Sequence, residues 1–115
     1  MKINNHILVV DDEPDICEFI RYYLTKRGYE VDVAGDGNEA LKSISKRLPD
    51  LILTDILMPD MNGITLCRKL KSSALTKEIP VLFLSASSDD VHLLGAMNAG
   101  GEDFISKPIR LLQLT

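Results

Sequence analysis

The sequence predicts an α/β fold in which five parallel strands form one doubly wound sheet with helices on both faces. Short apolar runs alternate with amphipathic segments along the chain, as expected of repeated β–α units. Proline and glycine stand at the beginnings and ends of these segments, where they start and stop helices. The length of 115 residues and the apolar fraction of 45% suit one compact domain with its own core.

The first half of the chain contains two predicted strands and two predicted helices. HILVV at 6–10 is a short apolar run typical of a buried strand, whereas YEVDVA at 29–34 alternates and is expected nearer an edge. A helix is expected over 14–28, and its inward face is predicted to hold Ile16, Phe19, Ile20, Tyr23 and Leu24. A second helix is expected over 37–48, capped by Asp36, with inward residues Ala40, Leu41, Ile44 and Leu48.

The second half continues the alternation. Strands are predicted over 50–54, 79–85 and 102–106, and helices over 63–73 and 89–100. A last helix begins at Pro108 but has only about eight residues before the chain ends, short of the typical ~11–12. We therefore expect this helix to be truncated, and residues 1–115 to form one domain in the N-terminal part of a longer protein.

Composition and charge exclude several classes of protein. The net charge of −4 argues against a module that binds nucleic acid directly, because such modules carry a basic face. No apolar run approaches the roughly 20 residues of a membrane span, and no polybasic run indicates a membrane surface. Cys17 and Cys67 lack the pattern of a disulfide framework, which favours a reducing, cytoplasmic location.

Polar residues that carry chemistry follow the predicted strands. Asp11 and Asp12 follow the first strand, Asp55 the third, Ser85 closes the fourth, and Lys107 follows the fifth. In an open α/β sheet, ligands bind beyond the carboxyl ends of the strands, at the point where the strand order reverses. With the order 2-1-3-4-5, these residues meet at one edge of the sheet.

The residue types in this cluster predict a phosphoryl-transfer site. Three neighbouring carboxylates repel one another unless a cation lies among them, and an all-oxygen ligand set selects a hard cation such as Mg²⁺. Lys107 adds a positive charge suited to a phosphate group, and Ser85 adds a hydroxyl donor. Positioning and charge neutralisation supply most of the catalysis in such sites. The candidate nucleophile is a carboxylate, which would become an acyl phosphate.

Four motifs resemble those of bacterial response-regulator receiver domains, the phosphorylated modules of two-component signalling. They are VVDDE (9–13), DILMPDMNG (55–63), LSA (84–86) and DFISKP (103–108). Their key residues are separated by 43, 30 and 22 positions from Asp12 through Asp55 and Ser85 to Lys107. The resemblance implies a flavodoxin-like fold, and the order 2-1-3-4-5 is the known order of the chemotaxis member of that family.

The resemblance also implies roles for individual residues. Asp55 is the expected acceptor of a phosphoryl group from the phosphohistidine of a sensor histidine kinase or of a phosphotransfer protein. Asp12, Asp55 and the backbone carbonyl of Leu57 are the expected direct ligands of Mg²⁺, and Asp11 is expected to bind it mainly through water. The domain would then be a signalling module that catalyses only its own phosphorylation and dephosphorylation. The apolar side chain of Leu57 suggests a second hypothesis, that it hinders the attacking water and prolongs the phosphorylated state.

A phosphorylation switch is implied as well. Ser85 and Lys107 would bind the phosphoryl group, and Phe104 matches the aromatic residue that turns inward when Ser85 moves. The face built from 89–100, 102–106 and the helix after Pro108 would then change shape for an output domain or a downstream partner. A homodimer through the same face is a further option.

Other functions remain alternatives. A Mg²⁺-dependent phosphatase of the aspartyl-phosphate type usually shows D-x-D-x-[TV], and the residue two positions after Asp55 is apolar. A binding module without phosphorylation would not need the complete set of acids, Ser85 and Lys107. A flavin site would need a phosphate-cradling loop after the first strand, where Asp11 and Asp12 stand instead. The alternative explanation for these two aspartates is purely structural: they cap the following helix.

Overall fold

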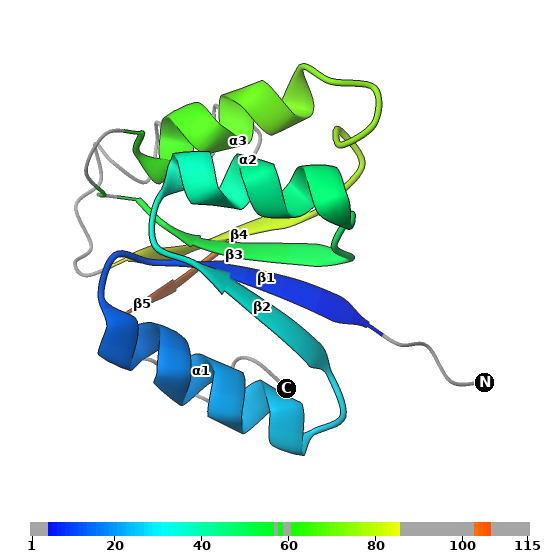
Figure 1. Ribbon diagram of the computed structural model, residues 1–115. Helices are drawn as coiled ribbons and strands as arrows, with labels where there is room; N and C mark the ends of the chain where they lie inside the picture. The colour runs from blue at the N-terminus through cyan, green and yellow to red at the C-terminus, as the bar shows by residue number, and fades with distance from the viewer. Residues whose placement is uncertain (1–4, 57, 59–60, 86–102, 107–115) are drawn as a thin grey trace.

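One five-stranded parallel sheet forms the centre of the molecule (Figure 1). The computed structural model describes residues 5–56, 58, 61–85 and 103–106. The strands are β1 (His6–Val10), β2 (Glu30–Ala34), β3 (Leu51–Asp55), β4 (Val81–Ser85) and β5 (Asp103–Ser106). They lie in the order β2-β1-β3-β4-β5, and every neighbouring pair is parallel. The predicted strand order is confirmed.

Helices cover both faces of this sheet, as predicted. Helix α1 (Pro14–Lys26) lies on one face, and α2 (Gly37–Lys46) and α3 (Gly63–Lys71) lie on the other (Figure 1). Successive side chains of β1 point to opposite faces, so Ile7 and Val9 pack against α1 while Leu8 and Val10 pack under α2 and α3. All five β1 residues are therefore buried, which explains why this strand is a continuous apolar run.

Local signals set the helix ends. Asp36 caps α2 by accepting a hydrogen bond from the Glu39 backbone N–H at 2.8 Å. The Glu39 carboxylate accepts in turn from the Gly35 N–H at 2.7 Å, so one backbone donor in the first turn of α2 and one before the helix are satisfied. Gly28 ends the segment after α1 with a φ of 94°, a backbone conformation that glycine adopts without cost. The predicted cap at Asp36 is confirmed.

Two predicted inward side chains are wrong. Phe19 is 48% exposed, and Cys17 takes its place in the core on the same helix. Leu48 is 50% exposed, because α2 ends at Lys46 and Arg47 is already extended at φ −156° and ψ 121°. A helical wheel continued past the end of the helix assigns Leu48 to a face that no longer exists.

Several predicted boundaries shift by one or two residues. Helices α1, α2 and α3 each end two residues before the predicted end. Strand β4 begins at Val81 and not at 79, because the preceding Ile79 N–H donates to Thr76 within a turn and Pro80 has no N–H. The predicted helices at 89–100 and after Pro108 lie outside the described residues. None of the described helices is long and apolar enough to cross a membrane.

Candidate functional site

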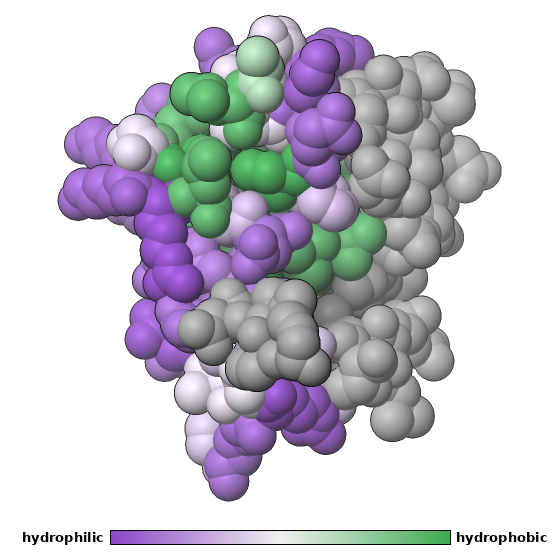
Figure 2. Space-filling model, turned by 90° about the vertical axis from the view of Figure 1, so that its right-hand side faces the viewer, coloured by the Kyte–Doolittle hydropathy of each residue, from purple (hydrophilic) through white to green (hydrophobic). Residues whose placement is uncertain are grey.

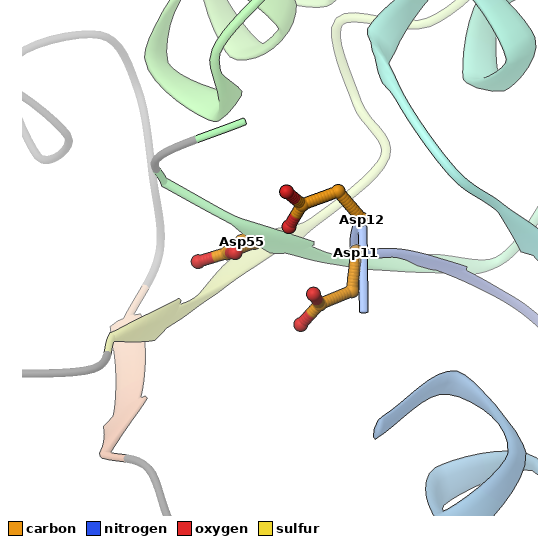
Figure 3. A group of neighbouring side chains, drawn as sticks. All are labelled: Asp11, Asp12 and Asp55. Carbon is orange, nitrogen blue, oxygen red and sulfur yellow. The ribbon is translucent and has the colours of Figure 1, made fainter. Parts of the chain in front are cut away.

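Three carboxylates meet at the carboxyl edge of the sheet. Asp11 and Asp12 follow β1, and Asp55 is the last residue of the neighbouring β3. One carboxylate oxygen from each of the three lies within 4.8 Å of the others. Figure 3 shows that the three side chains point to the same side, beyond the ends of the two strands. This is the cluster predicted from the sequence.

The backbone around Asp11 fixes the first carboxylate. The Asp11 N–H donates to the Ala34 carbonyl at 3.0 Å, which extends the β1–β2 pairing by one residue. Its side chain accepts a hydrogen bond from the Glu13 N–H at 3.0 Å, and the Cys17 thiol donates to its carbonyl at 3.3 Å. Asp11 is 1% exposed, whereas Asp12 is exposed, so the pair offers one buried and one accessible acid.

Asp55 is held just as firmly. It pairs with Leu84 of β4 and is 7% exposed. One carboxylate oxygen accepts from the Ile56 N–H at 2.8 Å, which fixes the orientation of the side chain. The buried Thr54 hydroxyl donates to the Asp55 carbonyl at 3.0 Å. Both the side chain and the backbone of Asp55 are therefore pre-positioned.

The loop after Asp55 returns very close to it. Gly63 begins α3, and its N–H donates to the Ile56 carbonyl at 2.8 Å. A methyl group on Gly63 would lie 2.0 Å from the Asp55 carbonyl oxygen, a distance that no real contact allows. The sequence marks Gly63 as a chain breaker, but only the structure shows that this glycine lets the helix approach the acidic residue.

The other predicted site residues are placed only in part. Ser85 is the last residue of β4, one position beyond the residue paired with Asp55, so its backbone lies at the same edge of the sheet. Phe104 lies on β5, paired with Phe83. Leu57 and Lys107 lie outside the described residues. Three residues that hold the site escaped the sequence analysis: Glu13, Cys17 and Thr54 act through backbone contacts that no local pattern reveals.

The helix-capping explanation of Asp11 and Asp12 does not agree with the structure. The N-cap position of α1 is Glu13, and this position makes no side-chain cap hydrogen bond. Asp11 instead accepts from the Glu13 N–H, before the helix begins. The two aspartates therefore face the site and not the helix.

The donor set fits a hard divalent cation. It contains only carboxylate oxygens, and among the described residues neither a cysteine nor a histidine belongs to it. Oxygen ligands without nitrogen or sulfur suit Mg²⁺ or Ca²⁺ better than zinc or copper. Three carboxylates so close together repel one another, and a bound cation would relieve that repulsion.

Comparison with known proteins identifies the family. The family described as the response regulator receiver domain matches residues 7–115. The chain is 35% identical over 112 residues to the DNA-binding response regulator MtrA of Mycolicibacterium smegmatis, covering 97% of this chain and 48% of MtrA. It is 38% identical over 106 residues to the alkaline phosphatase synthesis transcriptional regulatory protein PhoP of Bacillus subtilis, covering 92% of this chain and 43% of PhoP.

Solved structures agree with this assignment. The chemotaxis protein CheY4 of Vibrio cholerae superposes with a TM-score of 0.91 at 29% identity, covering 97% of this chain and 96% of that structure. The chain therefore covers 96% of the CheY4 structure but less than half of MtrA and of PhoP. Sequence, sheet order and acidic edge lead to the same conclusion: this chain belongs to the response-regulator receiver domains, the signalling modules of two-component systems.

Proposed function

We propose that Asp55 is the phosphoryl acceptor of this receiver domain and that Asp11, Asp12 and Asp55 hold Mg²⁺ beside it. The observation that carries the proposal is the convergence of the three carboxylates within 4.8 Å at the end of β1 and β3. The motif DILMPDMNG makes Asp55 the acceptor among the three, and the hydrogen bond from the Ile56 N–H at 2.8 Å holds its carboxylate at the strand end, which supports that role.

In the proposed reaction, a carboxylate oxygen of Asp55 attacks the phosphorus of a phosphohistidine on a sensor kinase or phosphotransfer protein. The new bond joins this oxygen to phosphorus, and the phosphorus–nitrogen bond breaks. The electron pair of that bond stays on the imidazole, which takes up a proton. When bound, Mg²⁺ would neutralise negative charge on the carboxylates and on the phosphoryl oxygens. The fixed backbone around Asp11 and Asp55 would hold these acids in place throughout.

Further roles follow from the motifs. We assign Ser85 and Lys107 to binding of the phosphoryl oxygens, Phe104 to the switch, and the Leu57 carbonyl to the metal. The position of Ser85 at the carboxyl edge, on the strand beside Asp55, supports its part of this assignment. The phosphorylated Asp55 would gain charge and acceptor oxygens, and a shift of Ser85 toward them would alter the face that includes β5.

The whole protein is proposed to be a longer regulator with this domain near its N-terminus. Support comes from MtrA and PhoP, in which the matched part is 48% and 43% of the length. Its partners would be a sensor histidine kinase and an output domain or downstream protein, with a homodimer as one possible assembly. The buried thiols of Cys17 and Cys67, neither of which is in a disulfide, agree with a cytoplasmic location.

Intact-mass spectrometry with acetyl phosphate and Mg²⁺ tests the acceptor. The wild-type chain should gain the mass of one phosphoryl group, and Asp55→Asn should gain none while keeping its thermal unfolding transition. Asp50→Asn is the matched control, because Asp50 lies just before β3, at the opposite end of the same strand, and should leave labelling intact. Labelling of Asp55→Asn to the wild-type extent would overturn the assignment.

A further inference from the structure

An apolar groove lies at the end of the molecule opposite the acidic site. It runs between the C-terminal ends of α2 and α3 and has a volume of about 410 Å³. Its apolar lining consists of Leu41, Ile44, Leu48, Leu70 and Leu75. Figure 2 shows the apolar side chains gathered on this end of the molecule, with hydrophilic side chains beside them. The phosphorylation chemistry proposed above uses none of these residues.

Two of the leucines that line the groove are exposed. Leu48 follows α2 and is 50% exposed, and Leu75 in the loop after α3 is 78% exposed. Single exposed leucines are common on protein surfaces. Here, however, two of them line one groove together with the apolar residues Leu41, Ile44 and Leu70. Concave sites lined by apolar side chains with a few polar groups are where ligands and partner helices commonly bind.

The loop that carries Leu75 is firmly built. The Thr76 hydroxyl donates to the Leu70 carbonyl at 2.6 Å, and the Lys77 N–H donates to the Ser73 carbonyl at 2.8 Å. The Lys71 ammonium donates to the carbonyls of Lys77 and Ile79 at 3.1 and 2.8 Å. These bonds tie the loop to the end of α3, and Leu75 lies 78% exposed on it. A partner that covered Leu75 would therefore lose little binding free energy to the ordering of this loop.

The charges at the groove have one sign. Lys46, Arg47 and Lys69 line it, and among the described residues no Asp or Glu does, although the chain as a whole has a net charge of −4. Arg47 forms an ion pair with Glu30 at 2.6 Å, whereas Lys46 and Lys69 make no ion pair within the part of the chain that the structure describes. The helix dipole also stabilises cations near helix C-termini, which explains part of the clustering of basic residues here. The dipole does not explain the two exposed leucines in the same groove.

We propose that this groove is a docking site for an acidic amphipathic helix of a partner protein. Apolar residues at positions i, i+3 or i+4 and i+7 of such a helix would fill the groove between Leu48 and Leu75. Aspartate or glutamate on its flanks would face Lys46 and Lys69, which steers association and sets the orientation. The groove shares no residue with the acidic cluster, so the proposed docking does not require phosphorylation of Asp55.

Peptide selection tests the proposal without a known partner. A displayed library of random 16-residue peptides is selected against the immobilised 115-residue chain, and the enriched peptides are synthesised with a fluorescent label for anisotropy titrations. Enriched sequences should combine two or more acidic residues with apolar residues at helical spacing. Leu75→Ala should weaken their binding about tenfold or more. Lys46→Glu together with Lys69→Glu should abolish it, and added salt should weaken it in the wild type.

Matched controls lie on the other face of the sheet. Tyr22→Ala removes an apolar side chain that is 64% exposed on α1, and Lys26→Glu reverses a charge on the same helix. Both should leave peptide affinity unchanged, and all variants should keep the wild-type circular dichroism spectrum. The proposal would be overturned if no peptides were enriched or if the enriched peptides were basic. It would also be overturned if Leu75→Ala left the peptide affinities unchanged. A concentration-dependent dimer that Leu75→Ala dissociates would also overturn it, since a second copy would then occupy the groove.

Discussion

Replacing Gly63 by alanine should damage both the stability and the chemistry of this domain. Gly63 begins α3 beside the backbone of Asp55, and its added methyl group would lie 2.0 Å from the Asp55 carbonyl oxygen. The same methyl group would lie 3.0 Å from the Asp55 carbonyl carbon and 3.2 Å from the Ile56 Cα. All three atoms belong to the backbone, so no side-chain rotation can relieve the overlap.

The expected magnitude follows from this geometry. The 2.0 Å separation has to grow beyond 3.0 Å, because shorter Cβ contacts essentially do not occur. Overpacking typically costs about 1–3 kcal/mol, and a rigid backbone neighbour places this variant at the upper end, about 3 kcal/mol. That is a large part of the roughly 5–15 kcal/mol that stabilises a domain. At an m value of about 2 kcal/mol/M, the urea midpoint would fall by about 1.5 M.

Urea unfolding followed by circular dichroism measures this loss, and intact-mass labelling with acetyl phosphate measures the effect on Asp55. We expect slower labelling, because a displacement of about 1 Å at a reacting group can cost about 100-fold in rate. Gly35→Ala is the matched control: it also lacks a positive φ, and its methyl group would meet only the flexible Glu39 carboxylate, at 3.4 Å. The control should stay within about 0.5 kcal/mol of wild type. A Gly63→Ala variant as stable and as readily labelled as Gly35→Ala would refute the reasoning.

Two further predictions concern the acidic edge and the core. Without Mg²⁺, Asp12→Asn should raise the free energy of unfolding by about 0.5 kcal/mol, because it relieves repulsion among the carboxylates. At saturating Mg²⁺ the wild type should instead be the more stable protein. It alone gains the stabilisation of about 2.7 kcal/mol that is expected when Mg²⁺ is in 100-fold excess over Kd. Thermal unfolding with and without Mg²⁺ measures both effects, and equal Mg²⁺ shifts for the two proteins would contradict a role of Asp12 in metal binding. On α1, Ile20→Ala should lower the free energy of unfolding by about 2–5 kcal/mol, because Ile20 is 0% exposed. Phe19→Ala should lower it by less than about 1 kcal/mol. Similar urea midpoints for the two variants would show that Phe19 packs in the core, as the sequence alone suggested.

The two ends of the sheet have separate properties. The carboxyl edge gathers negative charge on a rigid frame, and the amino edge carries an apolar groove with a basic rim. Helices α2 and α3 run between them, with the start of α3 against Asp55 and its end beside Leu75. Because the groove and the site share these helices, variants of Leu75 offer a direct way to ask whether binding at one end changes phosphorylation at the other.

Much of this protein could be predicted from the sequence. The alternation of apolar runs and amphipathic segments predicted the parallel sheet, and the strand ends predicted that Asp11, Asp12 and Asp55 would meet. These predictions succeed because strand burial and helix punctuation are local properties, and because parallel strands all end at one edge. The cap at Asp36 succeeded for the same reason, since its partner Glu39 is three residues away.

Other features were decided only by the tertiary structure. The exposure of Phe19 and Leu48 depended on where the sheet surface and the helix actually end. The thiol of Cys17 on Asp11 and the close approach of Gly63 to Asp55 join parts of the chain that meet only when the helices pack. A sequence pattern records which residue types alternate, but the distance between two backbones is set by the packing of the whole domain.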